Sequence, residues 1–575
     1  MKARIYTSAL LLLSLFTVVS AKGQIGWKWA KGAVLYSATS SGSGEGGWVT
    51  PDKAGGAFIA TNAPGYDSMR FDSILLGASA VTSVLIARTD ASGNYVWVKS
   101  TKNAYAEPVA VTSDMQGNLF VFGWYTTGAL KIDGFTLTTT ATSASFLLKV
   151  SRDGTVLWAR NISNNGGLAN DGGMFADNSG NIYLTSTYSS PTLTVGTTTL
   201  INKDHTGITH DQFIVKFTTS GDFVWAKDFG TAGDDVVFSI AQGGPGYFYF
   251  SGNIPQDSSI SFGTITLTGP HNSFYAKSDT DGNIIWARNL DANGYIKRLN
   301  NGCSDDLYMI GGYYNSIVLG PSAFTSAGGV DIFIAKADSD GNLLWGNSAG
   351  GSDWEAGFSL TTDLCGKLWV CGKMGSNPGS GISSMSFNGR LIYTPSGSSD
   401  PAFLAEYDTS GNFVDVMAFA SGSDDILSVV ADNAGSILFA GDYVGTQMQF
   451  GPFTMDTVTP GGGECIFIAK YTYDTIRCSS EIPSLLPHQN ERPDSNIITI
   501  YPNPSSYEWT ISATADFPAS SIVELYDLTG RLVNKFALYG SKMTISVAGL
   551  TSGMYQCRII SGNGQVVVKK LVAMK

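Results

Sequence analysis

The sequence repeats itself, and an internal repeat of about 60 residues constrains the fold more strongly than any other feature of the chain. Its unit is an apolar strand, a turn rich in Asp, Gly and Asn, and a second strand that carries a tryptophan. In the first copy these parts are residues 84–88, 90–94 and 96–99. The tryptophan recurs at Trp97, Trp158, Trp225, Trp286 and Trp345, and Val414 takes its place in a sixth copy. A side chain that recurs at one structural position predicts packing between neighbouring repeats.

A second hairpin lies between these units. In residues 109–123 a strand ends at Asp114, a Gly-Asn turn follows, and the next strand ends in Gly. Related turns start near Asp52, Asp177, Gln242, Asn301, Asp363 and Asp432. Two hairpins per period predict a four-stranded antiparallel sheet, which is the unit of a β-propeller blade.

The two ends of the repeat region complement each other. The seventh copy, residues 466–470, has no tryptophan strand after it, whereas residues 26–31 near the N-terminus read Gly-Trp-Lys-Trp-Ala-Lys. We therefore predict that residues 26–31 pair with the sheet of residues 425–472 and close a seven-bladed β-propeller. Because the loops between copies are long, eight blades or two smaller propellers remain open alternatives.

One run of residues carries a family resemblance. Residues 225–235 followed by 239–241 resemble the bacterial SBBP-type β-propeller repeat, and 350–353 and 422–425 are similar to the same pattern. The resemblance implies one propeller domain over residues 22–477, although Gln242 and Asn301 stand where the pattern prefers Asp. It implies a fold and no single activity.

The N-terminal segment has the features of a secretory signal peptide. Lys2 and Arg4 precede the apolar residues 9–19, and small residues favour cleavage after Ala21, with Gly23 as the alternative position. The apolar run is too short to span a bilayer as a helix, and no later stretch is long enough. These features predict residues 1–21 as a signal peptide on an exported chain.

The C-terminal residues form a separate module after a polar, Pro-bearing linker at residues 478–496. Strand patterns in residues 497–575 predict a small Ig-like β-sandwich. The module resembles the type A sorting domain of the type IX secretion system of Bacteroidetes, which implies recognition by the outer-membrane translocon and then release or surface attachment. The alternative is an ordinary Ig-like adhesive domain. The motif residues are Tyr501, Pro502, Asn503, Pro504, Gly530, Gly553, Tyr555, Lys569 and Lys570.

The charge balance narrows the class of partner. The chain has 35 Lys and Arg against 47 Asp and Glu, a formal charge of −12, which argues against nucleic acid or an anionic membrane. It has 4 histidines, and so few histidines argue against a histidine-ligated metal site or a catalytic triad. We find no catalytic motif, and we expect neither enzymatic activity nor a cofactor.

Six cysteines enter an oxidising compartment, and the sequence cannot choose among their 15 pairings. A bridge between Cys303 and Cys365 is conceivable, because these residues lie in matching loops of neighbouring repeats. The cysteines are Cys303, Cys365, Cys371, Cys465, Cys478 and Cys557.

Three acidic patterns are candidates for chemistry. Residues 279–283 and 338–342 resemble the start of a calcium loop but lack its closing Glu, so a hairpin turn is favoured over a Ca²⁺ site. The cluster of His205, His210 and Asp211 is better read as a polar loop than as a metal site. The adjacent carboxylates 234–235 and 424–425 face opposite sides of a strand, so turn capping and solvation are favoured over a glycosidase pair.

A last group of aromatic residues follows the second strands of the predicted blades and enters the loops. They are candidates for stacking on sugars or anchoring a protein, although rim packing is favoured. These candidate ligand-binding residues are Trp124, Tyr125, Tyr188, Tyr313, Tyr314 and Tyr443; Trp354, which lies elsewhere in the repeat, is a further candidate with the same alternatives.

The features together predict a monomeric, secreted or surface-anchored propeller that serves as a non-catalytic scaffold for binding a polysaccharide or a surface protein. Two alternatives stay open: an extracellular polysaccharide lyase or glycosidase with its site in the propeller loops, and a structural component of the cell surface or matrix.

Overall fold

The computed structural model describes residues 26–473 and 498–573 of the chain. Within these ranges it leaves out residues 33, 37–46, 64, 164–167, 256–257, 270–272, 303–304, 376–383, 394–400, 420–423, 433, 445–446, 457–463, 502–507, 514–520, 528–531, 539, 552 and 561–565. The predicted signal peptide and the predicted linker therefore lie outside the described residues. The fold is all-β, as expected, and no helix of the described residues is long and apolar enough to cross a bilayer.

The chain divides into two units: the first comprises Met1–Gln242 and Phe248–Ser479, and the second comprises Ser480–Lys575 together with the short segment Gly243–Tyr247. In the described part of the first unit, seven antiparallel sheets contain at least four strands each. Sheet 1 comprises β3 (Trp48–Pro51), β4 (Ala57–Ala63), β7 (Ser83–Thr89) and β8 (Tyr95–Ser100). Sheet 2 comprises β9 (Ala106–Ser113), β10 (Leu119–Ile132), β11 (Phe135–Val150) and β12 (Val156–Ser163). Sheet 3 comprises β13 (Leu168–Ala176), β14 (Ile182–Tyr188), β17 (Asp211–Phe217) and β18 (Phe223–Phe229). Sheet 4 comprises β19 (Val236–Gln242), β20 (Tyr247–Asn253), β23 (Ser273–Asp279) and β24 (Ile284–Asn289).

The remaining three sheets follow the same pattern. Sheet 5 comprises β25 (Gly294–Asn301), β26 (Leu307–Tyr313), β29 (Asp331–Ala337) and β30 (Leu343–Gly351), extended by β33 (Ser384–Phe387) and β34 (Arg390–Tyr393). Sheet 6 comprises β31 (Ala356–Thr362), β32 (Leu368–Lys373), β35 (Ala402–Tyr407) and β36 (Phe413–Phe419). Sheet 7 comprises β37 (Asp424–Ala431), β38 (Ser436–Val444), β41 (Glu464–Thr472) and β1 (Gly26–Gly32).

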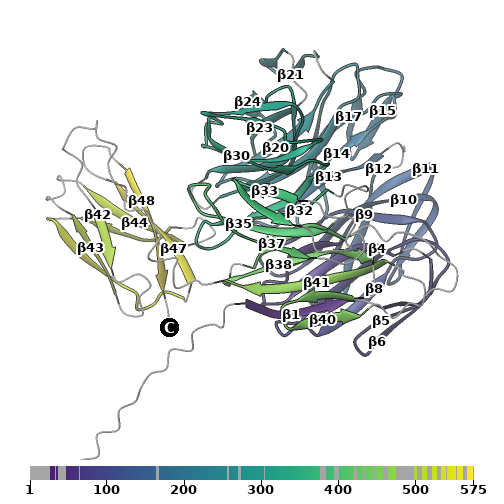
Figure 1. Ribbon diagram of the computed structural model, residues 1–575, viewed down its shortest axis with the longest axis horizontal. Helices are drawn as coiled ribbons and strands as arrows, with labels where there is room; N and C mark the ends of the chain where they lie inside the picture. The colour runs from purple at the N-terminus through teal and green to yellow at the C-terminus, as the bar shows by residue number, and fades with distance from the viewer. Residues whose placement is uncertain are drawn as a thin grey trace, which may run out of the picture. The chain divides into compact units, whose positions relative to one another are not determined.

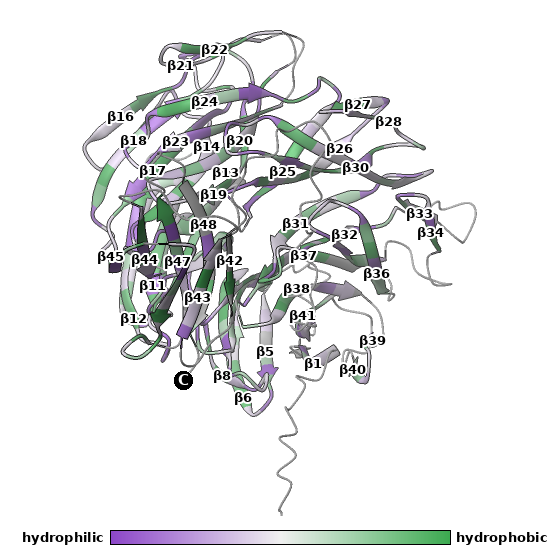
Figure 2. Ribbon diagram, turned by 90° about the vertical axis from the view of Figure 1, so that its left-hand side faces the viewer, coloured by the Kyte–Doolittle hydropathy of each residue, from purple (hydrophilic) through white to green (hydrophobic). Residues whose placement is uncertain are grey.

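The first strands of consecutive sheets lie against one another. They are in contact along the series β3, β9, β13, β19, β25, β31 and β37, and β37 also contacts β3. Figure 2 shows several of them around the middle of the unit. Each buried cluster between sheets draws side chains from both neighbours: Ile59 and Leu85 of sheet 1 share one with Leu438 and Ile468 of sheet 7. The core of this unit therefore lies between the sheets, including between the first and the last.

The strand nearest the N-terminus completes sheet 7. β1 pairs antiparallel with β41, with Ala30 opposite Ala469 and Gly32 opposite Phe467. Figure 1 shows β1 in purple beside β41 in green. The predicted pairing of residues 26–31 with the strands of the final copy is confirmed.

The repeat tryptophans pack between neighbouring sheets, as predicted. The indole Nε1 of Trp97 donates to the carbonyl of Arg152 at 2.9 Å, and that of Trp286 donates to the carbonyl of Ser339 at 3.1 Å. Each acceptor lies in the turn between the third and fourth strands of the next sheet. Each indole therefore links its own sheet to the following one.

Trp29 makes the same contact at the junction of the last and first sheets. Its Nε1 donates to the carbonyl of Ala91 at 3.1 Å, in the turn between β7 and β8. Gly93 of that turn has a φ of 85°, and a Cβ there would lie 2.6 Å from the indole of Trp29. Glycine is required because the turn has a left-handed conformation and the indole occupies the space of a side chain.

A third hairpin in the repeat was not expected from the sequence. It follows the second strand of a sheet and lies against the outer strand; β6, β16, β22 and β28 contact β8, β18, β24 and β30. Ring centroids of Phe71 and Tyr95 are 5.1 Å apart in the first hairpin, and those of Phe450 and Trp27 are 5.0 Å apart in the last. Covering the outer strand protects an edge that would otherwise be free to pair with another chain. In the first of these hairpins, β5 (Tyr66–Phe71) pairs with β6 (Ile74–Ser79) and also with β2 (Val34–Tyr36). The other hairpin strands outside sheet 5 are β15 (Thr192–Val195), β16 (Thr198–Ile201), β21 (Ile260–Phe262), β22 (Ile265–Leu267), β27 (Ser316–Leu319), β28 (Ser322–Thr325), β39 (Gln447–Phe450) and β40 (Phe453–Asp456).

One side chain connects the first strands of four sheets. Nη1 of Arg298, on β25, donates to the carbonyls of Gly172 on β13 and Phe238 on β19, at 3.2 and 3.1 Å. Its guanidinium lies 4.4 Å from the ring centroid of Trp48 on β3, which is a cation–π distance. The first strands of sheets 1, 3, 4 and 5 therefore converge on Arg298.

The second unit contains two antiparallel sheets among its described residues. One consists of β42 (Ile498–Tyr501), β43 (Glu508–Ala513) and β46 (Lys542–Ser546), and the other of β45 (Leu532–Ala537), β44 (Ile522–Asp527), β47 (Gly553–Ile560) and β48 (Val566–Ala573). Both contribute to one buried cluster, in which Trp509 and Ile545 of the first sheet meet Leu525 and Cys557 of the second. Two sheets that share an apolar core form a β-sandwich.

Candidate functional site

The loops of the first unit form two sets, because each sheet is antiparallel. The turns between first and second strands and between third and fourth strands lie at one end of the sheets. The connections between second and third strands and between consecutive sheets lie at the other end, which we call the loop face. All the predicted ligand-binding aromatic residues lie at this end of the sheets.

The acidic turns at the opposite end are closed by their own hydrogen bonds. Oδ1 of Asp279 accepts the N–H groups of Asp281 and Asn283 at 2.9 and 2.8 Å, and Oδ2 accepts the side-chain amide of Asn283 at 2.9 Å. Asp338 makes the same three bonds. Both oxygens of each carboxylate stabilise the turn, which supports the reading of these sequences as hairpin turns.

Four of the candidate tyrosines are packed in the core, which agrees with the favoured packing interpretation and not with ligand binding. Tyr125, Tyr188, Tyr313 and Tyr443 are fully or almost fully buried, because they end the second strands with their rings directed between the sheets. The hydroxyl of Tyr125 donates to Oδ1 of Asn161 at 2.9 Å. These rings belong to the core and are not accessible to a ligand at the rim.

The other predicted aromatic residues reach the loop face. Trp354 is 73% exposed and Tyr314 is 39% exposed. Trp124 is half-buried, and its ring centroid lies 5.5 Å from that of Tyr105, a residue that we did not single out in the sequence and that is 37% exposed.

Backbone hydrogen bonds hold the loop that presents Trp354. It connects β30 with β31, and the carbonyl of Asp353 accepts the N–H of Gly329 at 3.0 Å. The N–H of Glu355 donates to the carbonyl of Val330 at 2.9 Å, and Oε2 of Glu355 accepts the N–H of Gly351 at 3.1 Å. The loop is therefore held on both sides of the exposed indole.

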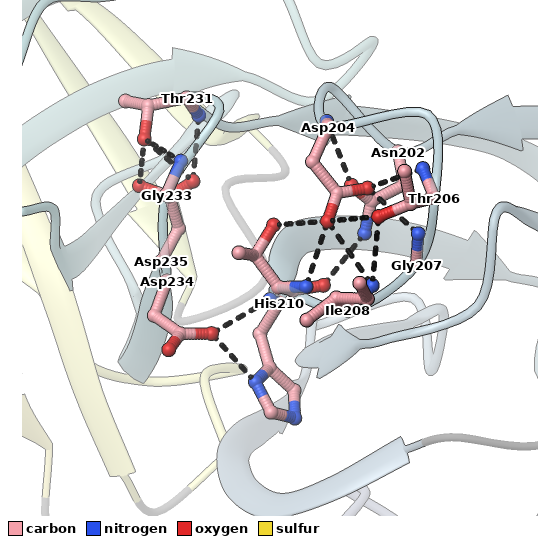
Figure 3. Close-up of polar contacts among 11 residues, drawn as sticks. Asn202, Asp204, Thr206, Gly207, Ile208, His210, Thr231, Gly233, Asp234 and Asp235 are labelled. Carbon is pink, nitrogen blue, oxygen red and sulfur yellow. Dashed lines mark hydrogen bonds and ion pairs between the residues drawn. The ribbon is translucent and has the colours of Figure 1, made fainter.

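His205 and His210 lie in a polar loop between β16 and β17, and Asp211 is the first residue of β17; Figure 3 shows the loop around His210. The carboxylate of Asp204 accepts N–H groups from residues 206–209 at 2.7 to 3.0 Å and so closes the loop on itself. Nδ1 of His210 lies 3.1 Å from Oδ1 of Asp234, whereas Oδ2 of Asp211 accepts the N–H of Lys203 at 2.9 Å. His210 and Asp211 thus have different partners. Among the described residues, no group of three or more His, Cys, Asp or Glu side chains is arranged to hold a metal ion.

Two pairs of buried carboxyl groups lie where sheets meet, below the loop face. Asp211 and Asp235 form the pair between sheets 3 and 4, and Asp331 and Glu355 form the pair between sheets 5 and 6. Loss of hydration, together with the facing carboxylate, raises the pKa of Asp235 to about 7 and that of Glu355 to about 7. Burial likewise raises the pKa of Asp211 to about 6.

The adjacent residues Asp234 and Asp235 face opposite ways, as the sequence predicted. The side chain of Asp234 is exposed and contacts His210, and this hydrogen bond lowers its pKa. Asp235 is fully buried, and Oδ2 accepts the N–H of Thr231 at 2.6 Å (Figure 3). Asp235 caps its loop as expected, but its side chain is buried in the core, whereas we expected it to be solvated. The side chains of residues 424–425 lie outside the described part.

The cysteines are only partly described. Cys365 is disulfide-bonded, whereas Cys371 and Cys557 are buried thiols whose pKa values are raised by loss of hydration. Cys465 is buried. Cys303 and Cys478 lie outside the described residues, so the pairing of Cys303 with Cys365 stays a prediction.

Several residues of the predicted sorting motif lie in strands of the second unit. Tyr501 belongs to β42, and Lys569 and Lys570 belong to β48, with the side chain of Lys569 exposed. Tyr555 is buried, and its hydroxyl donates to the carbonyl of Thr551 at 2.8 Å. Gly553 is the first residue of β47. The remaining motif residues, Pro502, Asn503, Pro504 and Gly530, lie outside the described part.

Sequence reasoning missed the facing carboxyl pairs and the neighbours of Trp124. Asp211 and Asp235 are 24 positions apart and belong to different sheets. Their one local signal is an acidic residue at the start of a third strand, which recurs at Asp331. The sequence did not predict the contact of Tyr105 with Trp124, because a single aromatic residue in a loop does not reveal which strand it will lie against.

Comparison with known proteins identifies the C-terminal module. Residues 499–574 match the family described as the secretion system C-terminal sorting domain. An uncharacterized WD repeat-containing protein of Acanthamoeba polyphaga mimivirus is 25% identical over 303 residues, which are 42% of this chain and 22% of that protein.

Two solved structures are similar over most of their length. A protein of unknown function from Dyadobacter fermentans has 8% identity and a TM-score of 0.32, with 77% of this chain and 98% of that chain covered. PorZ, a surface component of the type IX secretion system of Porphyromonas gingivalis, has 10% identity and a TM-score of 0.14, with 94% and 100% covered. Similarity at these TM-scores identifies neither a fold nor a function. The sorting domain, by contrast, indicates that the type IX secretion system exports this chain to the cell surface or the extracellular space.

Proposed function

We propose that the exported chain is a non-catalytic binding scaffold whose first unit is a closed seven-bladed propeller of the SBBP type. Closure is supported by the contact of β37 with β3 and by Trp29, which meets sheet 1 as Trp97 and Trp286 meet the sheets that follow them. Closure is also supported by Arg298, whose guanidinium contacts strands of three other sheets. A rigid ring presents its loops in fixed positions, which suits a scaffold.

The observation that carries the binding role is the exposed indole of Trp354. The repeat tryptophans Trp97 and Trp286 donate their N–H groups to the next sheet, whereas Trp354 is 73% exposed on a loop held by backbone hydrogen bonds. An exposed tryptophan on an ordered loop supplies a flat apolar surface for a sugar ring or a protein side chain. We therefore place ligand binding on the loop face.

The surroundings of the buried carboxyl groups favour binding over catalysis. Asp235 and Glu355 are fully or almost fully buried, and each accepts hydrogen bonds from its own loop. A glycosidase needs two carboxyl groups that reach the scissile bond from the pocket. These residues are better suited to hold the loops in place.

Binding and catalysis are separated by one experiment on the full exported chain. We expect the protein to be retained on a glycan array or on a purified surface protein, and chromatography to find the glycans intact after incubation. New reducing ends or unsaturated products would contradict the scaffold proposal, and so would the absence of binding to either class of ligand.

The sorting domain is proposed to be of type A and to be read by the outer-membrane translocon. Deleting residues 497–575 should leave the propeller unit in the periplasm, because the signal for the second membrane would be missing. Fractionation with an antibody to the first unit measures this. Unchanged export of the truncated chain would contradict the assignment.

A further inference from the structure

Four side chains meet on the loop face where sheets 1 and 2 adjoin. Asn62 comes from β4, Glu107 from β9, Trp124 from β10, and Tyr105 from the connection just before β9. Trp124 and Glu107 are directly opposite each other in the pairing of β10 with β9. Residues from three strands and a connecting segment of two sheets therefore converge on one place.

The polar contacts of this group centre on the carboxylate of Glu107. Its Oε1 accepts the hydroxyl of Tyr105 and the side-chain amide of Asn62, the latter at 3.4 Å. Tyr105 also lies against Trp124, with ring centroids 5.5 Å apart and ring planes inclined by 37°. An aromatic surface and a carboxylate are therefore presented side by side.

Two polar atoms of the group have no hydrogen-bond partner among the described residues. Asn62 is 6% exposed, and its Oδ1 is buried and unpaired although its Nδ2 contacts Glu107. The indole Nε1 of Trp124 is likewise buried and unpaired. Leaving a buried polar atom unpaired destabilises the folded state. An unpaired acceptor and an unpaired donor beside an exposed aromatic ring are features of a polar binding site.

The repeat itself does not require this arrangement. Trp124 stands one residue before the buried Tyr125, and the matching positions before Tyr188 and Tyr313 are Thr187 and Gly312. The repeat tryptophans, in contrast, recur because they fill the space between sheets. Trp124 and its neighbours are therefore a feature of this one junction, which favours a local role over a general packing role.

We propose that Tyr105, Trp124, Glu107 and Asn62 form a subsite for a neutral pyranose sugar. The ring of Tyr105, backed by Trp124, provides a flat apolar surface for one face of the sugar. Glu107 accepts hydrogen bonds from sugar hydroxyls, and the side-chain amide of Asn62 holds this carboxylate in position. A neutral sugar fits better than an acidic one, because Glu107 repels a second carboxylate and the chain carries a net charge of −12. This subsite rests on the proposed binding role and gives it a substrate class and a location.

The test uses the full chain and defined hexasaccharides of glucose, mannose, xylose and N-acetylglucosamine, with oligogalacturonate as the acidic counterpart. Isothermal titration measures binding to the wild type and to the variants Tyr105→Ala, Tyr105→Phe, Glu107→Gln and Trp354→Ala. Tyr393→Ala is the matched control, because Tyr393 is an exposed tyrosine on the outer hairpin of sheet 5. Thermal unfolding of each variant distinguishes lost binding from lost structure.

We expect at least one neutral hexasaccharide to bind and oligogalacturonate not to bind. Tyr105→Ala and Glu107→Gln should each weaken binding about tenfold or more, while Tyr105→Phe, which keeps the ring, should change it by less than about threefold. Tyr393→Ala should bind as the wild type does, and all unfolding midpoints should stay close together.

Different failures have different meanings. Binding that survives in Tyr105→Ala and Glu107→Gln, or that is lost only in Trp354→Ala, would overturn the subsite and leave the scaffold proposal intact. Preference for oligogalacturonate would also overturn the subsite. A wild-type chain that binds neither glycans nor a surface protein would remove the scaffold proposal and the subsite with it.

Discussion

Tryptophan has two opposite roles in this chain, and its position in the repeat decides between them. Trp286 stands in a fourth strand, where its indole is buried between sheets and donates to the carbonyl of Ser339. Trp354 stands in the connection between two sheets, where it is 73% exposed. The same side chain therefore contributes to stability at one position and is available for binding at the other.

Substituting these two residues should separate the roles. Trp286→Ala should lower the free energy of unfolding by about 3–5 kcal/mol, because it leaves a cavity between two sheets. Trp354→Ala should change it by less than about 0.5 kcal/mol, since the residue is on the surface. Chemical denaturation measures both. Equal losses in the two variants would contradict this division of roles.

A buried carboxyl group should make the stability of the fold depend on pH. Asp235 faces the N–H and hydroxyl of Thr231, the carboxyl of Asp211 on β17, and the neighbouring Asp234. Its pKa is raised to about 7, so between about pH 4 and pH 7 the folded state holds a proton that the unfolded state has released. The free energy of unfolding therefore falls as pH rises through this range.

Asp235→Asn should reduce this loss, because the amide keeps an acceptor for the N–H of Thr231 and cannot ionise. We expect the variant to be more stable than the wild type at pH 8, by about 1–3 kcal/mol, with the difference disappearing near pH 4. Denaturant titrations from pH 4 to pH 8 measure the slope.

The neighbouring residue provides the control for this prediction. Asp234→Asn changes an exposed carboxylate whose pKa is lowered by His210, so the pH slope of stability should remain close to that of the wild type. If Asp235→Asn has the wild-type slope as well, the buried carboxyl group is not the source of the pH dependence.

At the scale of elements, the two hairpins of each four-stranded sheet could be predicted from the sequence, whereas the outer hairpin could not. Alternating strands around Asp, Gly and Asn turns were enough to predict four strands per repeat. The outer hairpin was missed although its turn also recurs, for example at Gly196 and Gly451, because strands of three or four residues are too short to show a period of two. The burial of Tyr125 and Tyr443 was missed for a related reason: the last residue of a strand can face either the core or the solvent.

The strand β1 is the element on which the first unit depends most. Its two tryptophans contact different partners: Trp27 lies against Phe450 of the outer hairpin, and Trp29 lies against the turn of sheet 1. Removing residues 22–32 would expose the edge of β41 and the buried cluster that sheets 1 and 7 share.

We therefore expect the chain without residues 22–32 to unfold at a much lower temperature and to aggregate. Scanning calorimetry and light scattering measure this on the secreted protein. A deletion of the same length in the predicted linker at residues 478–496 is the control, because that segment is expected to join the units without contributing to either core. Equal unfolding temperatures for the wild type and the N-terminal deletion would contradict the role of β1.

At the scale of the whole molecule, the sequence predicted the export domain and the repeat unit, but it could not predict where a ligand binds. The sorting motif is recognisable because several short patterns occur in a fixed order. The candidate subsite at Tyr105 and Glu107, in contrast, depends on contacts between two sheets, and its residues have no shared spacing. Contacts at the centre, such as that of Arg298 with Trp48, escape sequence analysis for the same reason.

The account depends above all on the closure of the ring by β1, and amide hydrogen exchange of the secreted chain tests it most directly. The peptide that covers residues 26–32 should exchange as slowly as the peptide that covers β41, although it lies close to the predicted cleavage site, because both strands belong to sheet 7. Exchange of residues 26–32 within seconds, while β41 stays protected, would contradict the closed ring.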